Sequence, residues 1–152
     1  MPQFTDMRRP ALWAEARSRL VDSVVVGYDG SAASRRAVAR ATAVAEPGGT
    51  VVLVTASPPS RELEERIAAR RGRDADDLLD EAVELCRERD VQVATRVAHA
   101  EPVEALVEAA CDSAAGLIVI GARGQSFVAR ALRGPIGEAL VADAPCDVLV
   151  VR

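Results

Sequence analysis

Three glycines and three arginines gather in one stretch of the sequence, residues 121–134. Gly121 ends an apolar run, Gly124 follows three residues later, and nine further residues separate it from Gly134. Glycines let backbone N–H groups turn toward an anion, and a helix starting at Pro135 would add the positive end of its dipole. The arginines are Arg123, Arg130 and Arg133. The pattern predicts an anion-binding loop, and the alternative for its cations is that they are ordinary surface arginines.

Alternating apolar and helical patterns must position this loop. The expected strands cover residues 21–26, 51–54, 91–97, 117–120 and 148–151. Helical patterns separate them, so the strands should pair in parallel through right-handed crossovers. Strands that are apolar throughout fit a sheet covered on both faces. The sequence therefore predicts an α/β fold, a Rossmann-like open sheet of five parallel strands with helices on both faces.

Asp29 follows the first expected strand, in a Gly-Tyr-Asp-Gly-Ser segment. Ligands of open parallel sheets bind at the carboxyl ends of strands, near the point where the strand order reverses. If the strands at 21–26 and 117–120 are neighbours, Asp29 and the glycine loop share that edge. The alternative is structural, because Asp-Gly-Ser is also an ordinary turn with Ser31 as a helix N-cap.

The composition of the chain limits the classes of function that it can have. The 152 residues suggest one domain at 21–152 after an N-terminal arm at 1–20, which is either a short docked helix or a loose terminus. A net charge of −4 and 3% aromatic residues argue against a nucleic-acid partner. All 19 basic residues are arginine, which excludes a P-loop lysine and a lysine nucleophile. No apolar run approaches the roughly 20 residues of a membrane span, and no secretory signal is visible, so we expect a cytoplasmic protein without membrane contact.

Outside the glycine loop and Asp29, few residues suggest redox, catalytic or metal chemistry. The three cysteines, which lack CxxC spacing, are expected to be small buried side chains in a reducing compartment; they are Cys86, Cys111 and Cys146. His99 is the only histidine and is expected to fill a loop. The acidic residues at 74–81 fit the charged start of a solvated helix better than a metal site. We therefore expect no bound metal.

Three segments together resemble the universal stress protein family. The chain has V-V-G-Y-D-G-S at 25–31, G-A-R-G at 121–124 with Gly134 nine residues on, and A-P-C-D-V-L-V-V at 144–151. ATP-binding members carry G-x-x-G, nine residues, then G-[ST]. The resemblance covers about residues 21–152. It implies strand order 3-2-1-4-5 and a homodimer formed through the last strand, Val148–Val151.

The resemblance also implies a site for ATP or another adenine nucleotide. Asp29 would hold the ribose, and the backbone near Ala56 would meet the adenine. The three glycines would surround the ribose and phosphates, and Ser126 would add a hydroxyl to the phosphate cradle. The remaining candidate contacts are Gly27, Arg123, Gln125 and Pro135.

One departure from the family pattern bears on this site. The expected G-[ST] is Gly134-Pro135, and Gly137 stands where a serine is common, so two hydroxyls and one N–H are missing. Each lost hydrogen bond to a charged group is worth about 1.5–3 kcal/mol. Two hypotheses follow: a stress-response module that binds an adenine nucleotide, or a dimeric interaction protein that works without one. With no lysine or evident base, we expect no enzymatic activity beyond, at most, weak ATP hydrolysis.

Overall fold

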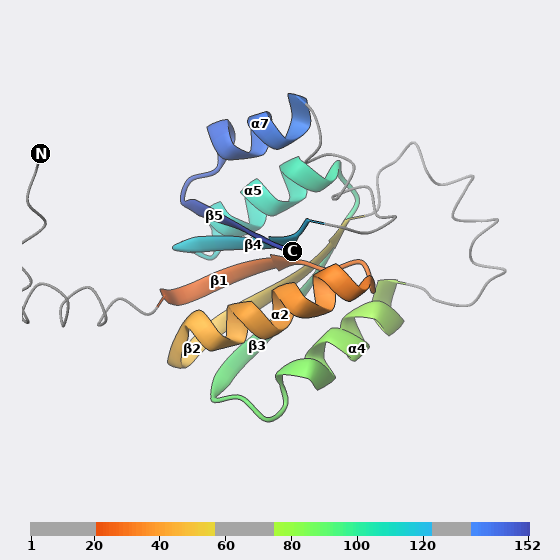
Figure 1. The fold of residues 1–152 in the computed structure, drawn as a ribbon, viewed down its shortest axis with the longest axis vertical. Coiled ribbons are helices and arrows are strands. Elements are labelled where there is room, and N and C mark those ends of the chain that lie inside the picture. The colour runs from red at the N-terminus through yellow and green to blue at the C-terminus, as the bar shows by residue number, and fades with distance from the viewer. Residues whose placement is uncertain (1–20, 57–74, 123–134) are drawn as a thin grey trace, which may run out of the picture.

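A computed structural model describes residues 21–56, 75–122 and 135–152. The predicted N-terminal arm at 1–20 lies outside these residues. The five strands form one parallel sheet in the order β3-β2-β1-β4-β5, as predicted (Figure 1). The strands are β1 Val21–Gly27, β2 Ala45–Ala56, β3 Val91–Ala98, β4 Leu117–Gly121 and β5 Asp147–Val151. The helices between them are α2 Ala32–Val44, α4 Ala75–Cys86, α5 Pro102–Asp112 and α7 Pro135–Asp143.

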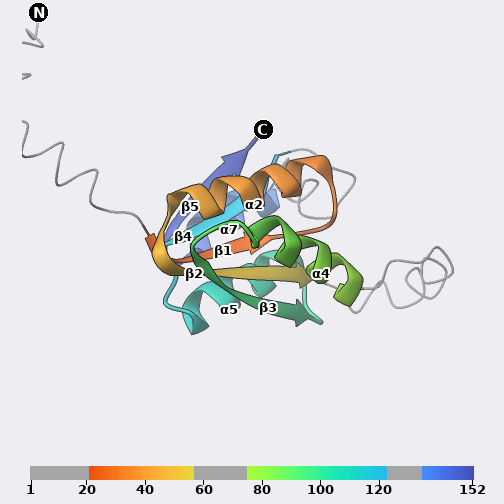
Figure 2. The same cartoon turned by 90° about the horizontal axis from the view of Figure 1, so that it is seen from below.

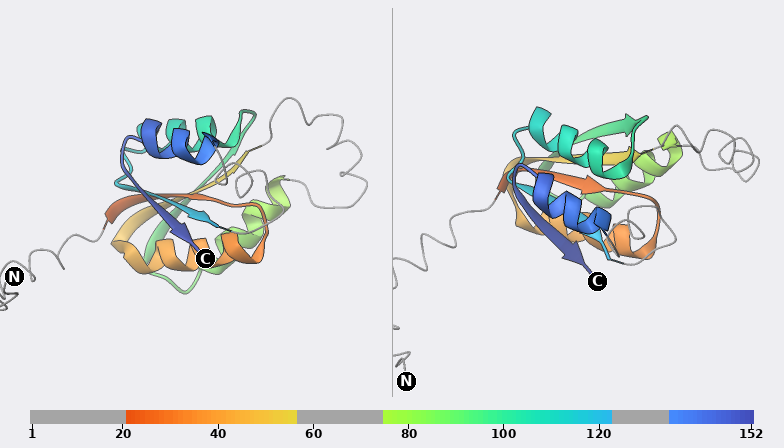
Figure 3. Two further views of the ribbon diagram at one scale, coloured as in Figure 1. Left: turned by 45° about the horizontal axis from the view of Figure 1, so that its top comes forward. Right: turned by 90° about the horizontal axis from the view of Figure 1, so that it is seen from above.

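Helices cover both faces of the sheet. Helices α2 and α4 lie on one face, and α5 and α7 lie on the other (Figure 3). The strand residues alternate between two cores: Val24 and Val26 pack with Ala37 of α2, whereas Val25 packs with Leu106 of α5. This is why the central strands are apolar without interruption, since both of their faces are buried.

Strand β2 begins earlier than the sequence predicts. Helix α2 ends at Val44 and the next residue already belongs to β2, whereas the expected strand started at Val51. The extra length includes Gly48, which has a φ of +76°, and a register shift against β1 between Val21 and Ser23. The predicted strand start at Val51 is wrong, because an irregular strand end tolerates Pro47, Gly48 and Gly49, which are otherwise rare in strands.

Helix α5 packs its apolar face on the sheet. Its buried residues are Pro102, Ala105, Leu106, Ala109 and Ala110. Val103 and Val107 are half-buried and pack on the same core, whereas Cys111 is exposed. Of the other two cysteines, Cys146 is half-buried and Cys86 is buried. The expectation of a buried side chain is therefore confirmed for Cys86 and wrong for Cys111. A rotation of 100° per residue turns Cys111 away from the sheet.

The end of α5 is a tight turn built on an unusual residue. Ala115 N–H donates to the Ala110 carbonyl and Ala114 N–H donates to the Cys111 carbonyl, which is the Schellman pattern. Ala114 holds the left-handed position with a φ of 48°, where glycine is usual.

Among the described residues, no helix has the length and apolar character needed to cross a lipid bilayer.

Candidate functional site

The first and fourth strands are neighbours, as the candidate site requires. Val26 of β1 pairs with Val119 of β4, so the carboxyl ends of both strands lie at one edge of the sheet (Figure 2). The strand order reverses here, because β2 lies on one side of β1 and β4 on the other. This is the position at which open parallel sheets place their ligands. Asp29 and Gly121 therefore share an edge, which confirms the condition set from the sequence.

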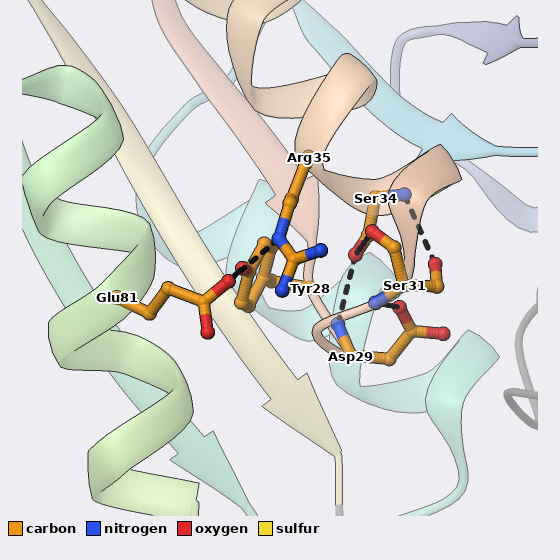
Figure 4. Close-up of polar contacts among 6 residues, drawn as sticks. All are labelled: Tyr28, Asp29, Ser31, Ser34, Arg35 and Glu81. Atoms are coloured by element: carbon orange, nitrogen blue, oxygen red, sulfur yellow. Dashed lines mark hydrogen bonds and ion pairs between the residues drawn. The ribbon is translucent and has the colours of Figure 1, made fainter.

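Asp29 lies in a hydrogen-bonded turn between β1 and α2. Its Oδ1 accepts from Ser31 N–H at 2.9 Å, and its own N–H donates to Ser34 Oγ at 3.4 Å (Figure 4). Gly30 completes the turn with a φ of 77°. Ser31 Oγ accepts from Ser34 N–H at 3.1 Å and caps α2. The Asp-Gly-Ser segment thus forms a turn and a helix N-cap, as its structural alternative predicts. This turn holds the half-buried carboxyl group of Asp29 at the edge of the sheet.

Tyr28, directly before Asp29, is anchored to the two helices of its face. Its side chain is 2% exposed, and its hydroxyl donates to Glu81 Oε1 of α4 at 2.6 Å (Figure 4). Arg35 Nε of α2 donates to the same oxygen at 2.7 Å. Burial and the bond to Glu81 raise the pKa of Tyr28 to about 12. The sequence did not predict this cluster, and the only signal for it is that a buried tyrosine hydroxyl needs a partner.

The backbone of Tyr28 is tied to the end of β2. Its N–H donates to the Val54 carbonyl at 2.8 Å, and its carbonyl accepts from Thr55 Oγ1 at 3.0 Å. Thr55 is 7% exposed, and the half-buried Ala56 follows it. Tyr28 precedes Asp29 and Thr55 precedes Ala56, so the hydrogen bond between Tyr28 and Thr55 joins the two segments that carry Asp29 and Ala56.

Gly121 has a packing role that the sequence did not reveal. A Cβ built at Gly121 would lie 2.7 Å from the carbonyl carbon of Ala33 and 2.8 Å from its Cβ. Helix α2 therefore approaches the end of β4 as closely as glycine allows. At Gly27 the nearest atoms to an added Cβ are side-chain methyls of Ile120 and Leu106 at 3.4 Å, which is ordinary contact.

The rest of the predicted loop lies mostly outside the described residues and stays a prediction. This applies to Arg123, Gly124, Gln125, Ser126 and Gly134. Pro135 is the first residue of α7, as predicted. His99 is exposed. Within the described ranges, no three side chains of the metal-ligating types come together.

Comparison with known proteins agrees with this architecture. A universal stress protein of Thermus aquaticus is 34% identical over 139 residues, which span 86% of this chain and 98% of that protein. One from Mycobacterium tuberculosis is 31% identical over 147 residues, spanning 86% and 95%. A universal stress protein solved in complex with cAMP superposes with a TM-score of 0.59 at 30% identity, covering 88% of this chain and 98% of that one.

The family model described as the universal stress protein family matches residues 21–152, which is the whole of the predicted domain. The five-stranded order, the turn at Asp29 and the glycine at the end of β4 all fall within that match. The chain belongs to the universal stress protein family.

Proposed function

We propose that this chain binds an adenine nucleotide at the edge of the sheet where β1 and β4 end. The observation that carries the proposal is the shared position of Asp29 and Gly121 at the reversal of strand order. The likeness to a universal stress protein solved with cAMP supports an adenine nucleotide as the ligand. The protein would act as a small cytoplasmic stress-response module that registers the nucleotide.

Each part of the nucleotide has a candidate contact. The Asp29 carboxylate can accept hydrogen bonds from ribose hydroxyls, while its Oδ1 keeps the bond to Ser31 N–H. The backbone at Ala56 would meet the adenine. The glycine loop after Gly121 would hold the phosphates, with its arginines as charged donors. Pro135 has no N–H to offer at the start of α7, so phosphate binding would depend on that loop.

Equilibrium binding of labelled ATP, AMP and cyclic AMP to the purified protein tests the proposal. We expect saturable binding of at least one of them. Asp29→Asn should weaken it while leaving stability nearly unchanged, because the amide oxygen can still accept from Ser31 N–H. If none of the three nucleotides binds saturably at millimolar concentration, the proposal is wrong.

The departures at Pro135 and Gly137 provide a second test. Restoring the family hydroxyls with Pro135→Ser and Gly137→Ser should raise the affinity for ATP, since each hydrogen bond to a charged group is worth about 1.5–3 kcal/mol. AMP and cyclic AMP, which carry one phosphate, should gain less. No gain for ATP would mean that the hydroxyls are not what limits binding.

The second candidate function is that of a dimeric interaction protein that works without nucleotide, and β5 favours it. This strand is at the edge of the sheet, and its Val150 is 44% exposed; Val141 of α7 is 67% exposed. An apolar edge strand invites pairing with another strand. We propose a homodimer formed through Val148–Val151.

Sedimentation at micromolar concentration tests the dimer. We expect a dimer for the wild type and a monomer for Val150→Arg, which places a charge on the exposed edge. Val141→Arg, a matched change outside the strand, should stay dimeric. A wild type that sediments only as a monomer, or a Val150→Arg variant that stays dimeric, would argue against this interface.

A binding role also fits the residue types better than an enzymatic one. The chain has no lysine in its sequence, and His99, its only histidine, is exposed. We therefore propose no catalytic residue, and nucleotide hydrolysis by the wild type should not exceed that of Asp29→Asn.

A further inference from the structure

Thr55 makes a buried polar contact that no part of the proposed site yet uses. Its side chain is 7% exposed, and Oγ1 donates to the Tyr28 carbonyl at 3.0 Å across the sheet, between residues 27 positions apart. A valine would fill the same volume, and valine occupies three of the four preceding positions of β2, 51, 52 and 54. A hydroxyl in this apolar strand therefore needs a reason beyond packing.

The contact lies between the two segments that would hold the base and the sugar. Tyr28 is followed by Asp29, and Thr55 is followed by Ala56. Just past the end of β1, the backbone contributes the bond from Tyr28 N–H to the Val54 carbonyl. The Thr55 bond adds a second link just beyond it, so the two strand ends cannot separate without breaking a buried hydrogen bond.

Tyr28 is itself held from the other side. Its hydroxyl is fixed by Glu81 of α4, and Glu81 is also bound by Arg35 of α2 (Figure 4). A residue held at its N–H, carbonyl and hydroxyl has little freedom to move. Because Tyr28 is held in place, the hydrogen bond from Thr55 Oγ1 to its carbonyl also fixes the position of the end of β2.

We infer that Thr55 is a positioning residue of the nucleotide site, which sets the spacing between the Asp29 and Ala56 segments through its bond to the Tyr28 carbonyl. The inference rests on the proposed function, because it presumes that an adenine nucleotide spans those two segments. Thr55 itself is not expected to touch the ligand.

The test compares the affinity of Thr55 variants for whichever of ATP, AMP and cyclic AMP the wild type binds best. Thr55→Val removes the hydrogen bond at constant volume and should weaken binding about fivefold or more, equivalent to roughly 1 kcal/mol. Thr55→Ser restores the hydroxyl and should bind within about twofold of the wild type. Circular dichroism establishes that each variant is folded under the binding conditions, so a loss of global stability alone does not move the affinity.

Thr42→Val is the matched control. Thr42 is equally buried at 7% exposure, and its Oγ1 donates to the Ala39 carbonyl at 3.0 Å inside α2, away from the proposed site. It should bind like the wild type. If Thr55→Val does not fold, Thr55→Cys, which keeps the volume and weakens the hydrogen bond, replaces it under the same criteria.

The outcomes separate the two proposals. A wild type that binds none of the three nucleotides overturns the proposed function. The positioning role alone is overturned if the wild type binds and Thr55→Val binds with the same affinity. It is also overturned if Thr55→Ser binds as weakly as Thr55→Val, or if Thr42→Val is impaired as much as Thr55→Val.

Discussion

Replacing Gly121 by alanine should destabilise the domain strongly, whether or not a nucleotide is bound. The added Cβ would lie 2.7, 2.8 and 2.9 Å from the carbonyl carbon, the Cβ and the carbonyl oxygen of Ala33. These atoms belong to the first turn of α2, which is tied to the preceding turn by the Ser31 cap. They cannot move aside as the end of a flexible side chain would.

The magnitude follows from the kind of clash. Overpacking costs typically 1–3 kcal/mol, and a clash with backbone belongs at the upper end, so we expect a loss of about 3 kcal/mol. For a domain of this size each kcal/mol lowers Tm by roughly 3 °C, so Tm should fall by roughly 10 °C. Gly27→Ala should cost less than about 1 kcal/mol, because its nearest neighbours are side-chain methyls at 3.4 Å.

Urea unfolding followed by far-ultraviolet circular dichroism measures both variants. Tryptophan fluorescence is a poor probe, because the only tryptophan, Trp13, precedes the domain. The reasoning is refuted if Gly121→Ala unfolds within about 0.5 kcal/mol of the wild type, the scatter of ordinary surface substitutions. It is also refuted if Gly27→Ala is equally destabilised. A confirmed result means that weak nucleotide binding by Gly121→Ala would not by itself identify a phosphate contact.

Other variants test the remaining local features. Tyr28→Phe should cost about 1.5 kcal/mol of unfolding free energy in urea at neutral pH, because it removes a hydrogen bond to the Glu81 carboxylate. Since the pKa of Tyr28 is raised to about 12 from an unfolded value near 10, its stabilising effect is complete below pH 10 and is lost as the pH rises toward 12. The stability difference between wild type and Tyr28→Phe should therefore shrink over that interval, and a constant difference would contradict the raised pKa. Ala114→Gly should stabilise the domain by up to about 1 kcal/mol in thermal unfolding, because a φ of 48° strains alanine but not glycine; a destabilised variant would show that this strain is absent. Ser31→Ala should cost about 1 kcal/mol by removing the cap on Ser34 N–H, and an unchanged Tm would argue against that cap.

The sequence determined the class of fold and the starts of several elements. Apolar runs separated by helical patterns predicted the parallel sheet, and the family resemblance predicted its order, which the structure confirms. Ser31 and Pro135 marked helix starts correctly. These signals are local, because a cap or a first-turn proline acts on residues only a few positions away. The shared edge of Asp29 and Gly121 also followed, once the strand order was known.

Tertiary packing decided what the individual residues at that edge do. The bond from Tyr28 to Glu81 joins residues 53 positions apart, and the close approach of Gly121 to Ala33 depends on how α2 lies across β4. The rotation of α5 that exposes Cys111 was likewise set by its packing on the sheet. A periodic pattern specifies which residue types share a face within limits of about one position, but not which atoms meet across elements. Gly121 therefore reads in the sequence as part of an anion-binding loop, and only the fold shows that its missing side chain makes room for a helix.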